Sequence, residues 1–344
     1  MTTGTKTSPD DAGTPRFPLK GVDAVLADLD GVVYTGPNAI EYAVDSLNKV
    51  AEDRRVGYIT NNASRTPATV AAQLSGFGLK VTGDDVVTSP QAAVRLLATV
   101  VDKGAKVLVV GGDGLTTVVE AAGFEITRSA DDSPAAVIQG FAPDVGWKDL
   151  AEASFALAKD IPWVATNQDW TIPQERGIAP GNGTLVAAVH TAVGKLPLIA
   201  GKPERAIFDA AVERFGAKKA LFIGDRLDTD IAGAVKAGLT SALVLTGIDK
   251  AKQVLAAPES SRPDFIFEDL RELHEEYPAT LETKDPRGTR SFTVRNARVE
   301  LRGNQVVAVA KGESSVDLLR AGAAAVWGSG LAIYGLVVDP ALYE

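Results

Sequence analysis

Two aspartates, Asp28 and Asp30, directly follow a short apolar run near the N-terminus of the chain. The run, Ala24 to Ala27, is typical of a strand that is buried on both faces of a parallel sheet. The aspartates would then lie at the carboxyl end of that strand, where open α/β sheets bind their ligands. Because neighbouring carboxylates repel each other, they destabilise a fold unless a cation or a reaction uses them. The pair therefore predicts a metal site or an acid–base site.

Polar residues also follow later apolar runs. Thr60 and Asn61 end one strand pattern, and Asp225 and Asp230 follow another. Lys202 adds a cation at the start of an expected helix. Each of these residues alone could be a turn residue, a helix cap or a solvated side chain. Their joint appearance at strand ends, in this order, indicates one catalytic site built from carboxylates, a hydroxyl, an amide and a lysine.

The elements that must position these residues alternate between strand and helix. This alternation predicts an α/β fold with a doubly wound, Rossmann-like parallel sheet, interrupted by an inserted α/β domain. The first pattern has strands at 24–27, 56–59, 85–88, 220–223, 241–245 and 265–267, and helices at 40–51, 67–79, 203–215 and 231–237. The inserted pattern has strands at 106–110, 135–139 and 162–166, and helices at 90–101, 115–122, 147–159 and 182–193.

The domain boundaries follow from this alternation and from composition. We expect a disordered tail at 1–17, a catalytic core at 18–88 and 198–280, an inserted cap domain at 89–197 and a C-terminal ββαβ appendage at 281–344. In the appendage, a linker at 284–290 precedes strands at 291–301 and 305–310, a helix at 315–327 and a strand at 331–338.

Composition excludes several classes of function. The net charge of −9 gives a general nucleic-acid-binding role no electrostatic basis. The absence of cysteine excludes disulfides, thiolate catalysis and cysteine-ligated zinc, and fits a cytoplasmic protein. Only two histidines are present, which argues against a histidine metal cluster or triad. The uncharged span 321–338 is interrupted by Gly328 and Gly330, so we expect a helix, a turn and a strand there, with no membrane span.

These residues carry a resemblance to a known family. The segment from Asp28 to Tyr34 (D-L-D-G-V-V-Y) resembles the first motif of the haloacid dehalogenase superfamily. Thr60-Asn61, Lys202 and the segment from Gly224 to Asp230 resemble its second, third and fourth motifs. The match runs from about residue 18 to residue 277. The insertion resembles the α/β (type II) cap of the branch with p-nitrophenylphosphatase-like, phosphoglycolate and glycerol 3-phosphate phosphatases.

The resemblance implies a division of roles among the carboxylates. Asp28 would be the nucleophile that forms an aspartyl-phosphate. Asp30 would protonate the leaving group and then activate water, and its presence separates the phosphatases from the dehalogenases of the superfamily. Mg²⁺ would be held by Asp28, by the main-chain carbonyl of Asp30 and by Asp225, with Asp230 in support.

The resemblance also implies which residues bind the substrate. Gly31, Thr60, Asn61 and Lys202 would bind the phosphoryl group. In the cap, Asn167 and Asp169 are candidates for substrate contact. The glycine-rich turn at 180–184 could bind an anion or a hydroxyl at its helix start, or Asn182 and Thr184 could simply cap that helix; the sequence leaves both open. Relatives often carry an acidic residue shortly after the position of Gly140, where this chain has Phe141-Ala142, which puts that specificity role in doubt.

The predicted function is a Mg²⁺-dependent phosphatase of a small phosphomonoester, with glycerol 3-phosphate as the predicted substrate. The alternatives are 2-phosphoglycolate or another sugar or polyol phosphate, then a phosphotransferase, and last a phosphate-sensing module without activity. The partners expected are a small-molecule substrate and no nucleic acid, with a homodimer left open. The resemblance does not explain the segment 281–344. Its order would suit part of an acetyltransferase-like fold, but it lacks a glycine-rich pyrophosphate loop, which favours a packing, oligomerising or regulatory role.

Overall fold

The computed structural model describes residues 16–174 and 176–344. The chain forms two compact units, one made of Met1–Val56 and Lys218–Glu344 and the other of Gly57–Ala217. The predicted disordered tail lies outside the described residues except for Arg16 and Phe17. Arg16 forms an isolated antiparallel bridge with Tyr277, so these last two tail residues are part of the first unit.

The first unit contains a buried parallel sheet. Its strands lie in the order β15-β14-β13-β1, and nearly every residue in them is buried. Continuous apolar strands are expected where helices cover both faces of a sheet, so the predicted strands of this unit are confirmed. The bounds are β1 (Ala24–Ala27), β13 (Ala220–Gly224), β14 (Thr240–Val244) and β15 (Phe265–Phe267), with helices α1 (Ala43–Val50), α8 (Ala232–Ala237) and α9 (Ala251–Ala256), and a short hairpin of β2 (Tyr34–Thr35) and β3 (Asn38–Ala39).

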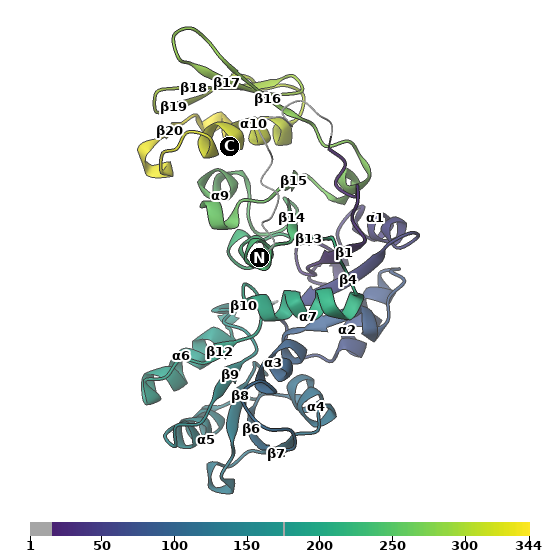
Figure 1. The fold of residues 1–344 in the computed structure, drawn as a ribbon, viewed down its shortest axis with the longest axis vertical. Coiled ribbons are helices and arrows are strands. Elements are labelled where there is room, and N and C mark those ends of the chain that lie inside the picture. The colour runs from purple at the N-terminus through teal and green to yellow at the C-terminus, as the bar shows by residue number, and fades with distance from the viewer. Residues whose placement is uncertain (1–15, 175) are drawn as a thin grey trace. The chain divides into compact units, whose positions relative to one another are not determined.

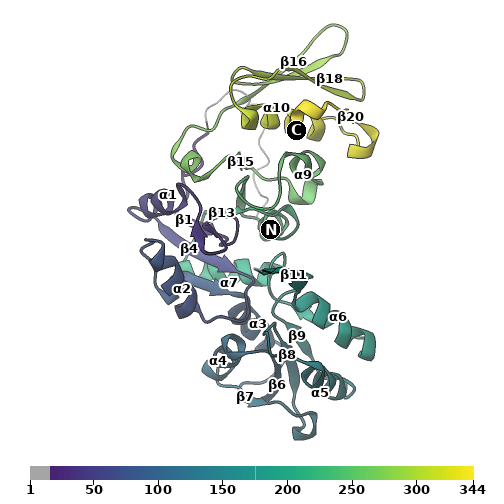
Figure 2. The same cartoon turned by 180° about the vertical axis from the view of Figure 1, so that it is seen from behind.

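The C-terminal part of the first unit is a five-stranded sheet covered by one helix (Figures 1 and 2). Four strands run antiparallel in chain order, and the last pairs in parallel with the fourth. They are β16 (Thr280–Lys284), β17 (Arg290–Val294), β18 (Ala297–Arg302), β19 (Gln305–Ala310) and β20 (Val337–Val338), and the helix is α10 (Ser315–Trp327). The element order is therefore ββββαβ, and the predicted ββαβ order is wrong.

The extra strands have local causes. A tight turn at Arg295, whose φ is 48°, splits the expected strand 291–301 into β17 and β18. Arginine carries no preference for positive φ, so the sequence gives no glycine or asparagine signal at that position. The strand β16 precedes the expected linker, and most of the expected strand 331–338 is loop and a 3₁₀ turn at Ile333–Gly335.

A buried ion-pair cluster joins α10 to the parallel-sheet part of the same unit. Arg320 is 5% exposed and donates to Asp317 Oδ1 at 2.8 Å, to the Ile266 carbonyl oxygen at 3.0 Å, and to the Glu272 carboxylate. Asp317 is 1% exposed and also accepts from Arg295 at 3.0 Å. Apolar residues of both parts form one continuous core around this cluster. The C-terminal part is therefore packed through α10 against the parallel-sheet part of the same unit, and it is not a loosely tethered appendage.

Replacing Asp317 by alanine should destabilise the first unit strongly. The change would leave the buried Arg320 guanidinium without one of its carboxylates, and breaking a buried pair in this way costs about 3–5 kcal/mol. Arg302→Ala is the matched control, because its pair with Glu300 is half-exposed and such pairs contribute less than about 1 kcal/mol. Urea denaturation measures both variants. Equal losses in the two would show that the buried pair has no special role.

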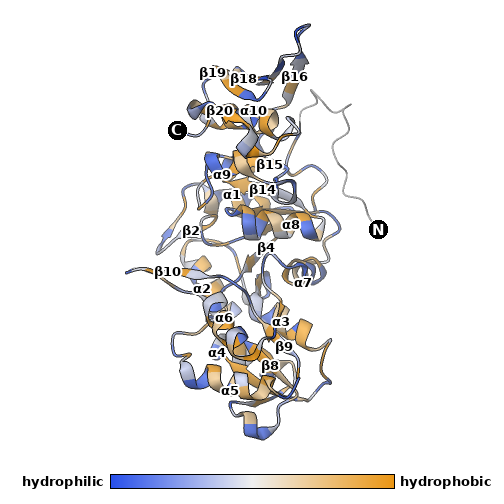
Figure 3. Cartoon of the chain, turned by 90° about the vertical axis from the view of Figure 1, so that its left-hand side faces the viewer, coloured by the Kyte–Doolittle hydropathy of each residue, from blue (hydrophilic) through white to orange (hydrophobic). Residues whose placement is uncertain are grey.

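The second unit contains a parallel pair of strands and a separate five-stranded parallel sheet. The pair is β4 (Arg55–Thr60), which begins two residues before this unit, and β5 (Val86–Thr88). The larger sheet has the order β12-β9-β8-β6-β7, and Figure 3 shows that β8 and β9 are mostly hydrophobic. Its strands are β6 (Lys106–Val110), β7 (Glu125–Thr127), β8 (Ala136–Gln139), β9 (Trp163–Ala165) and β12 (Leu198–Ile199).

The helices of the second unit cover its strands as the alternation predicts. In the larger sheet, α4 lies on one side and α5 and α6 lie on the other (Figures 1 and 2). The helices are α2 (Pro67–Gly76), α3 (Ser89–Leu97), α4 (Asp113–Ala121), α5 (Trp147–Leu157), α6 (Asn182–Val193) and α7 (Arg205–Phe215). The sequence did not predict the short edge strands β12 and β7. It also did not predict the hairpin of β10 (Thr171–Gln174) and β11 (Gly177–Pro180). Segments this short carry little periodicity.

The unit that contains the expected cap also contains strands assigned to the core, so the domain boundaries at 88/89 and 197/198 stay a prediction. Within the part of the chain that the structure describes, no helix is long and apolar enough to cross a bilayer. The uncharged span 321–338 consists of the end of α10, loop, a 3₁₀ turn and the two-residue strand β20, so α10 ends near the glycines as expected while most of the expected strand is absent.

Candidate active site

Three carboxylates meet in the first unit. Oxygens of Asp28, Asp225 and Asp230 all lie within 4.8 Å of one another, and the three residues are buried. Asp28 and Asp225 come from the ends of adjacent strands, since Ala27 pairs with Ile223 and the Asp28 N–H donates to the Ile223 carbonyl at 2.8 Å. Asp230 lies in a π-helical turn, Leu227–Ile231, which comes shortly after Asp225. We call these three residues the carboxylate cluster.

The carboxylate cluster is tightly enclosed by main chain. The Asp230 carboxylate accepts from the N–H groups of Asp225 and Arg226, both at 3.2 Å. A Cβ atom on Gly31 or Gly247 would overlap the Asp225 carboxylate, and one on Gly224 would overlap Asp230. Gly31 also has a φ of 81°, which favours glycine. Glycine at these positions therefore allows the backbone to close around the carboxylates.

Asp30 has a different environment from the carboxylate cluster. Its residue is exposed, and its Oδ2 accepts a hydrogen bond from the Tyr34 hydroxyl at 3.2 Å. The hairpin that supplies Tyr34 is held by the Gly31 N–H, which donates to the Tyr34 carbonyl at 2.8 Å. An exposed carboxylate with a fixed orientation can exchange protons with a ligand and with water, which a buried metal ligand cannot do as readily. The two aspartates of the opening motif are thus placed differently.

The loop after β14 belongs to this site and was missed by sequence reasoning. The Ile248 N–H donates to Asp225 Oδ2 at 2.7 Å, and the Thr246 hydroxyl donates to the Gly31 carbonyl at 2.7 Å. Asp249 accepts from the Leu227 N–H at 2.6 Å. The available signal resembled the one used elsewhere, because Thr246 directly follows the expected apolar strand at 241–245 and Asp249 comes three residues later.

Two further acidic residues beside the carboxylate cluster have perturbed ionisation. Burial raises the pKa of the Asp249 carboxyl, against the opposing effect of the Leu227 N–H. Burial also acts on Asp228, but the hydrogen bonds and charge of Arg226 outweigh it and lower the pKa of Asp228. The Asp228 carboxylate accepts from the Arg226 guanidinium at 2.7 and 3.0 Å and is mostly exposed. Asp228 therefore forms a surface pair with Arg226 and is not part of the carboxylate cluster.

A second set of predicted residues meets in the second unit. Asn61 Oδ1 accepts from the Lys202 N–H at 2.8 Å, and Asn61 Nδ2 donates to the Lys202 carbonyl at 3.1 Å and to Asp169 Oδ1 at 3.0 Å. The Asn61 carbonyl accepts from Asn167 Nδ2 at 2.8 Å. Thr60 ends β4 and is 3% exposed, and Lys202 is 4% exposed. We call Thr60, Asn61, Asn167, Asp169 and Lys202 the amide–lysine cluster.

The glycine-rich turn at the start of α6 does not cap the helix through a side chain, and its two glycine N–H groups have main-chain acceptors. The Gly181 N–H donates to the Trp170 carbonyl at 2.8 Å, and the Gly183 N–H donates to the Asp169 carbonyl at 2.9 Å. Asn182 Nδ2 donates to the Asn167 carbonyl at 2.8 Å, and no side-chain cap is present on α6. The helix-cap alternative for this turn is therefore wrong, and anion or hydroxyl binding at the turn stays a prediction. The turn holds the 167–170 loop.

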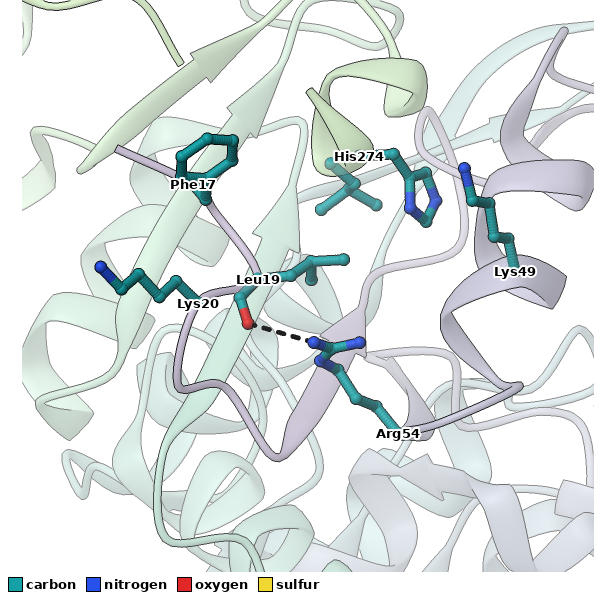
Figure 4. A pocket seen from close by; sticks show the side chains of 7 residues that line it. Phe17, Leu19, Lys20, Lys49, Arg54 and His274 are labelled. Atoms are coloured by element: carbon teal, nitrogen blue, oxygen red, sulfur yellow. Dashed lines mark hydrogen bonds between the residues drawn. The ribbon is translucent and has the colours of Figure 1, made fainter. Parts of the chain in front are cut away.

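The two histidines and a basic pocket are not part of the carboxylate cluster or the amide–lysine cluster. His190 Nδ1 is hydrogen-bonded to the Lys195 carbonyl, and His274 Nε2 to the Ser46 carbonyl. The pocket in Figure 4 is lined by Phe17, Leu19, Lys20, Lys49, Arg54, Leu273 and His274. Arg54 donates there to the carbonyls of Leu19 and Val22 and pairs with Asp53. These contacts fasten the N-terminal segment, and none of the predicted site residues lies in the pocket.

The carboxylate cluster has the chemistry of a magnesium site. Its donors are all carboxylate oxygens, which Mg²⁺ prefers over nitrogen and sulfur ligands. Three buried carboxylates at this separation repel one another strongly unless a cation lies among them. A parallel α/β sheet with such a cluster at its strand ends is typical of enzymes with an oxygen-ligated metal centre.

Comparison with known proteins identifies the family. A model of the haloacid dehalogenase-like hydrolases matches residues 25–125, and a second model of such hydrolases matches residues 199–273. The D-glycerol 3-phosphate phosphatase of Mycobacterium tuberculosis is 42% identical over 89% of this chain and 86% of its own length. The chain therefore belongs to the haloacid dehalogenase-like hydrolases, in the phosphatase branch that was predicted. The predicted fold class and enzyme class are confirmed.

Solved structures agree with this assignment. A glycerol phosphate phosphatase from M. tuberculosis in complex with magnesium has a TM-score of 0.83 and 40% identity, over 94% of both chains. A p-nitrophenyl phosphatase from Archaeoglobus fulgidus has a TM-score of 0.68 and 28% identity, over 73% of this chain and 98% of its own. The magnesium in the first of these supports the predicted Mg²⁺ cofactor. The match to the M. tuberculosis structure covers 94% of this chain, and the remaining residues are fewer than those of the C-terminal sheet region. That match therefore includes at least part of the C-terminal sheet region.

Proposed function

We propose that the chain is a Mg²⁺-dependent phosphatase that hydrolyses a small phosphomonoester, with glycerol 3-phosphate as the substrate. The observation that carries the chemistry is the carboxylate cluster of Asp28, Asp225 and Asp230, beside the exposed Asp30. The choice of substrate is supported by the relative at 42% identity, whose name gives D-glycerol 3-phosphate.

The two aspartates of the first motif take different roles in the proposed reaction. An Asp28 carboxylate oxygen attacks phosphorus, an aspartyl-phosphate forms, and the P–O bond to the substrate oxygen breaks. Asp30 donates a proton to that leaving oxygen and then accepts a proton from the water that hydrolyses the intermediate. The exposure of Asp30 and its hydrogen bond from Tyr34 support this proton transfer.

The remaining residues hold the metal and the phosphoryl group. The carboxylates of Asp28 and Asp225 and the Asp30 carbonyl are the proposed ligands of Mg²⁺, with Asp230 in support through its bonds to the Asp225 loop. Bound Mg²⁺ would neutralise charge on the phosphoryl oxygens. Gly31, Thr60, the Asn61 main chain and Lys202 are proposed to bind those oxygens, where charge develops during transfer. A buried ammonium such as that of Lys202 suits an anionic ligand.

The alternatives differ in substrate or in acceptor. 2-Phosphoglycolate or another sugar or polyol phosphate would use the same chemistry with different cap contacts. We place these contacts in the inserted domain, proposed as residues 89–197, where Asn167 and Asp169 lie. A phosphotransferase would pass the phosphoryl group to an alcohol, and a sensing module would bind phosphate without turnover. The enzyme is proposed to be cytoplasmic, which its lack of cysteine supports, and light scattering would measure whether it forms the homodimer left open above.

A phosphate-release screen tests this proposal. Wild-type protein with Mg²⁺ is given glycerol 3-phosphate, 2-phosphoglycolate and a panel of sugar phosphates, and the Asp28→Asn protein serves as the blank. We expect the highest kcat/KM with glycerol 3-phosphate and release to water without an added alcohol. A higher value with 2-phosphoglycolate would support that alternative. Consumption of the phosphomonoester only when an acceptor alcohol is present, with a new phosphate ester formed and no inorganic phosphate released, would indicate a phosphotransferase. No phosphate release and no transfer from any phosphomonoester would overturn the phosphatase.

A further inference from the structure

The side chain of Asn61 has one favourable orientation because of its partners. Its oxygen accepts from the Lys202 N–H at 2.8 Å, while its nitrogen faces two acceptors, the Lys202 carbonyl at 3.1 Å and Asp169 Oδ1 at 3.0 Å. A flipped amide would place its oxygen against a carbonyl and a carboxylate, and its N–H₂ group against an N–H donor. The Asp169 carboxylate therefore fixes the orientation of the Asn61 amide, and the amide in turn fixes the main chain at Lys202.

Asp169 is itself held in place by its neighbours. Its N–H donates to Asn167 Oδ1 at 3.1 Å, and its carbonyl accepts from the Gly183 N–H at 2.9 Å. A Cβ atom on Gly181 would overlap the Asp169 carbonyl oxygen, and one on Gly183 would overlap the preceding carbonyl. The start of α6 thus approaches the loop as closely as only glycine permits, and the loop cannot shift without breaking several hydrogen bonds.

The space around Lys202 is equally restricted. A Cβ atom on Gly201 would overlap the Thr166 carbonyl and the Asn61 side-chain oxygen. The Asn61 carbonyl also accepts from the Ser89 hydroxyl at 2.6 Å and from Asn167 Nδ2 at 2.8 Å. The main chain at Asn61 and at Lys202 is therefore closely packed on both sides of their contact. Asp169 is the charged residue of this hydrogen-bond network.

We propose that Asp169 is a positioning residue, which acts through the Asn61 side chain to fix the Lys202 main chain and so the placement of the Lys202 ammonium on the phosphoryl group. The proposal rests on the proposed function, in which Lys202 binds that group. It differs from the sequence-based hypothesis that Asp169 contacts the substrate. A residue that fixes the phosphate-binding machinery affects every phosphomonoester equally, whereas a residue that contacts substrate hydroxyls affects only substrates that carry them.

The first test compares Asp169→Ala and Asp169→Asn on two substrates, glycerol 3-phosphate and p-nitrophenyl phosphate, the second of which has no hydroxyl groups. We expect Asp169→Ala to lower kcat/KM by about 10–100-fold for both substrates, as loss of a positioning partner does. Asp169→Asn keeps an acceptor oxygen for Asn61 Nδ2 and should recover most of the loss. Asp144→Ala, at an exposed position in the same unit, is the control and should match wild type. A loss confined to glycerol 3-phosphate, or no loss, would overturn the proposal.

A second test uses a double-mutant cycle with Asn61→Ala, which keeps the main-chain N–H that is proposed to bind phosphate. If Asp169 acts through the Asn61 side chain, the double variant should be no worse than Asn61→Ala alone. Additive losses would show an independent role. Calorimetric titration with inorganic phosphate in Mg²⁺ gives a readout without turnover, and we expect Asp169→Ala to weaken binding by a similar factor. If the wild type is inactive but Asp169→Ala still weakens phosphate binding, the proposed phosphatase is overturned and the positioning role is supported. If Asp169→Ala leaves phosphate binding unchanged, the positioning role is overturned.

Discussion

Asp28→Asn should release no measurable phosphate from any phosphomonoester while the protein stays folded. The amide cannot form the aspartyl-phosphate, and loss of a covalent nucleophile lowers kcat by about 10⁴-fold or more in hydrolases whose residues act as a unit. The measurement is phosphate release with Mg²⁺, over long incubation and at high enzyme concentration. Asp45→Asn is a suitable control, because Asp45 is an exposed aspartate on α1 of the same unit.

The folding of this variant has its own expectation. Asp28 lies with two other buried carboxylates whose oxygens are within 4.8 Å of its own, so removal of its charge relieves repulsion when no cation is present. In EDTA, the melting temperature of Asp28→Asn should therefore equal or exceed that of wild type. If the melting temperature of Asp28→Asn is lower than that of wild type, its loss of activity would be explained by a destabilised fold. If a folded Asp28→Asn protein retains turnover, the assignment of Asp28 as the nucleophile is contradicted.

Removal of divalent cations should stop turnover and lower the melting temperature, and Mg²⁺ should restore both. A ligand that binds only the folded state stabilises it by about 2.7 kcal/mol at a concentration 100-fold above its Kd. Asp225→Asn should lose most of this Mg²⁺-dependent shift, because it removes one of the charges of the carboxylate cluster. Thermal denaturation and calorimetric titration with Mg²⁺ measure the effect. A wild-type melting temperature that is the same in EDTA and in Mg²⁺ would argue against a metal at this cluster.

Gly247→Ala tests the same site by shape instead of charge. Its Cβ would overlap the Asp225 carboxylate, whereas a Cβ at Gly335 would meet no atom within 4 Å. We expect Gly247→Ala to weaken the Mg²⁺-dependent stabilisation and Gly335→Ala to leave it as in wild type. If both variants bind Mg²⁺ as wild type does, the loop after β14 does not enclose the metal centre.

Much of the fold was predictable because its signals are local. Continuous apolar runs marked β1, β6 and β13 closely, and the start of α6 was predicted at the residue where the structure has it. The prediction was wrong where a conformation carries no composition signal. Arg295 makes a positive-φ turn between two strands, and the short edge strands of the second unit have too few residues to show a period.

The sequence by itself determined which residues end the buried strands and that their types suit metal-assisted phosphoryl chemistry. Asp28, Asp30 and Asp225 were identifiable because a polar residue directly after an apolar run is a contiguous pattern. Only the tertiary structure decided which partners these residues meet. Asn61 is 108 residues from Asp169 along the chain, and the Asp225 carboxylate accepts from an amide 23 residues later.

The buried Arg320 likewise finds Glu272 48 residues away. A hydrogen bond between distant segments depends on how loops close over the sheet, and no local pattern records that closure. For this reason the family resemblance implied different roles for Asp28 and Asp30, but no local pattern predicted that the first would be buried and the second exposed. Only the folded chain brings the Tyr34 hydroxyl to Asp30, and the loop after β14 to Asp225 and Gly31.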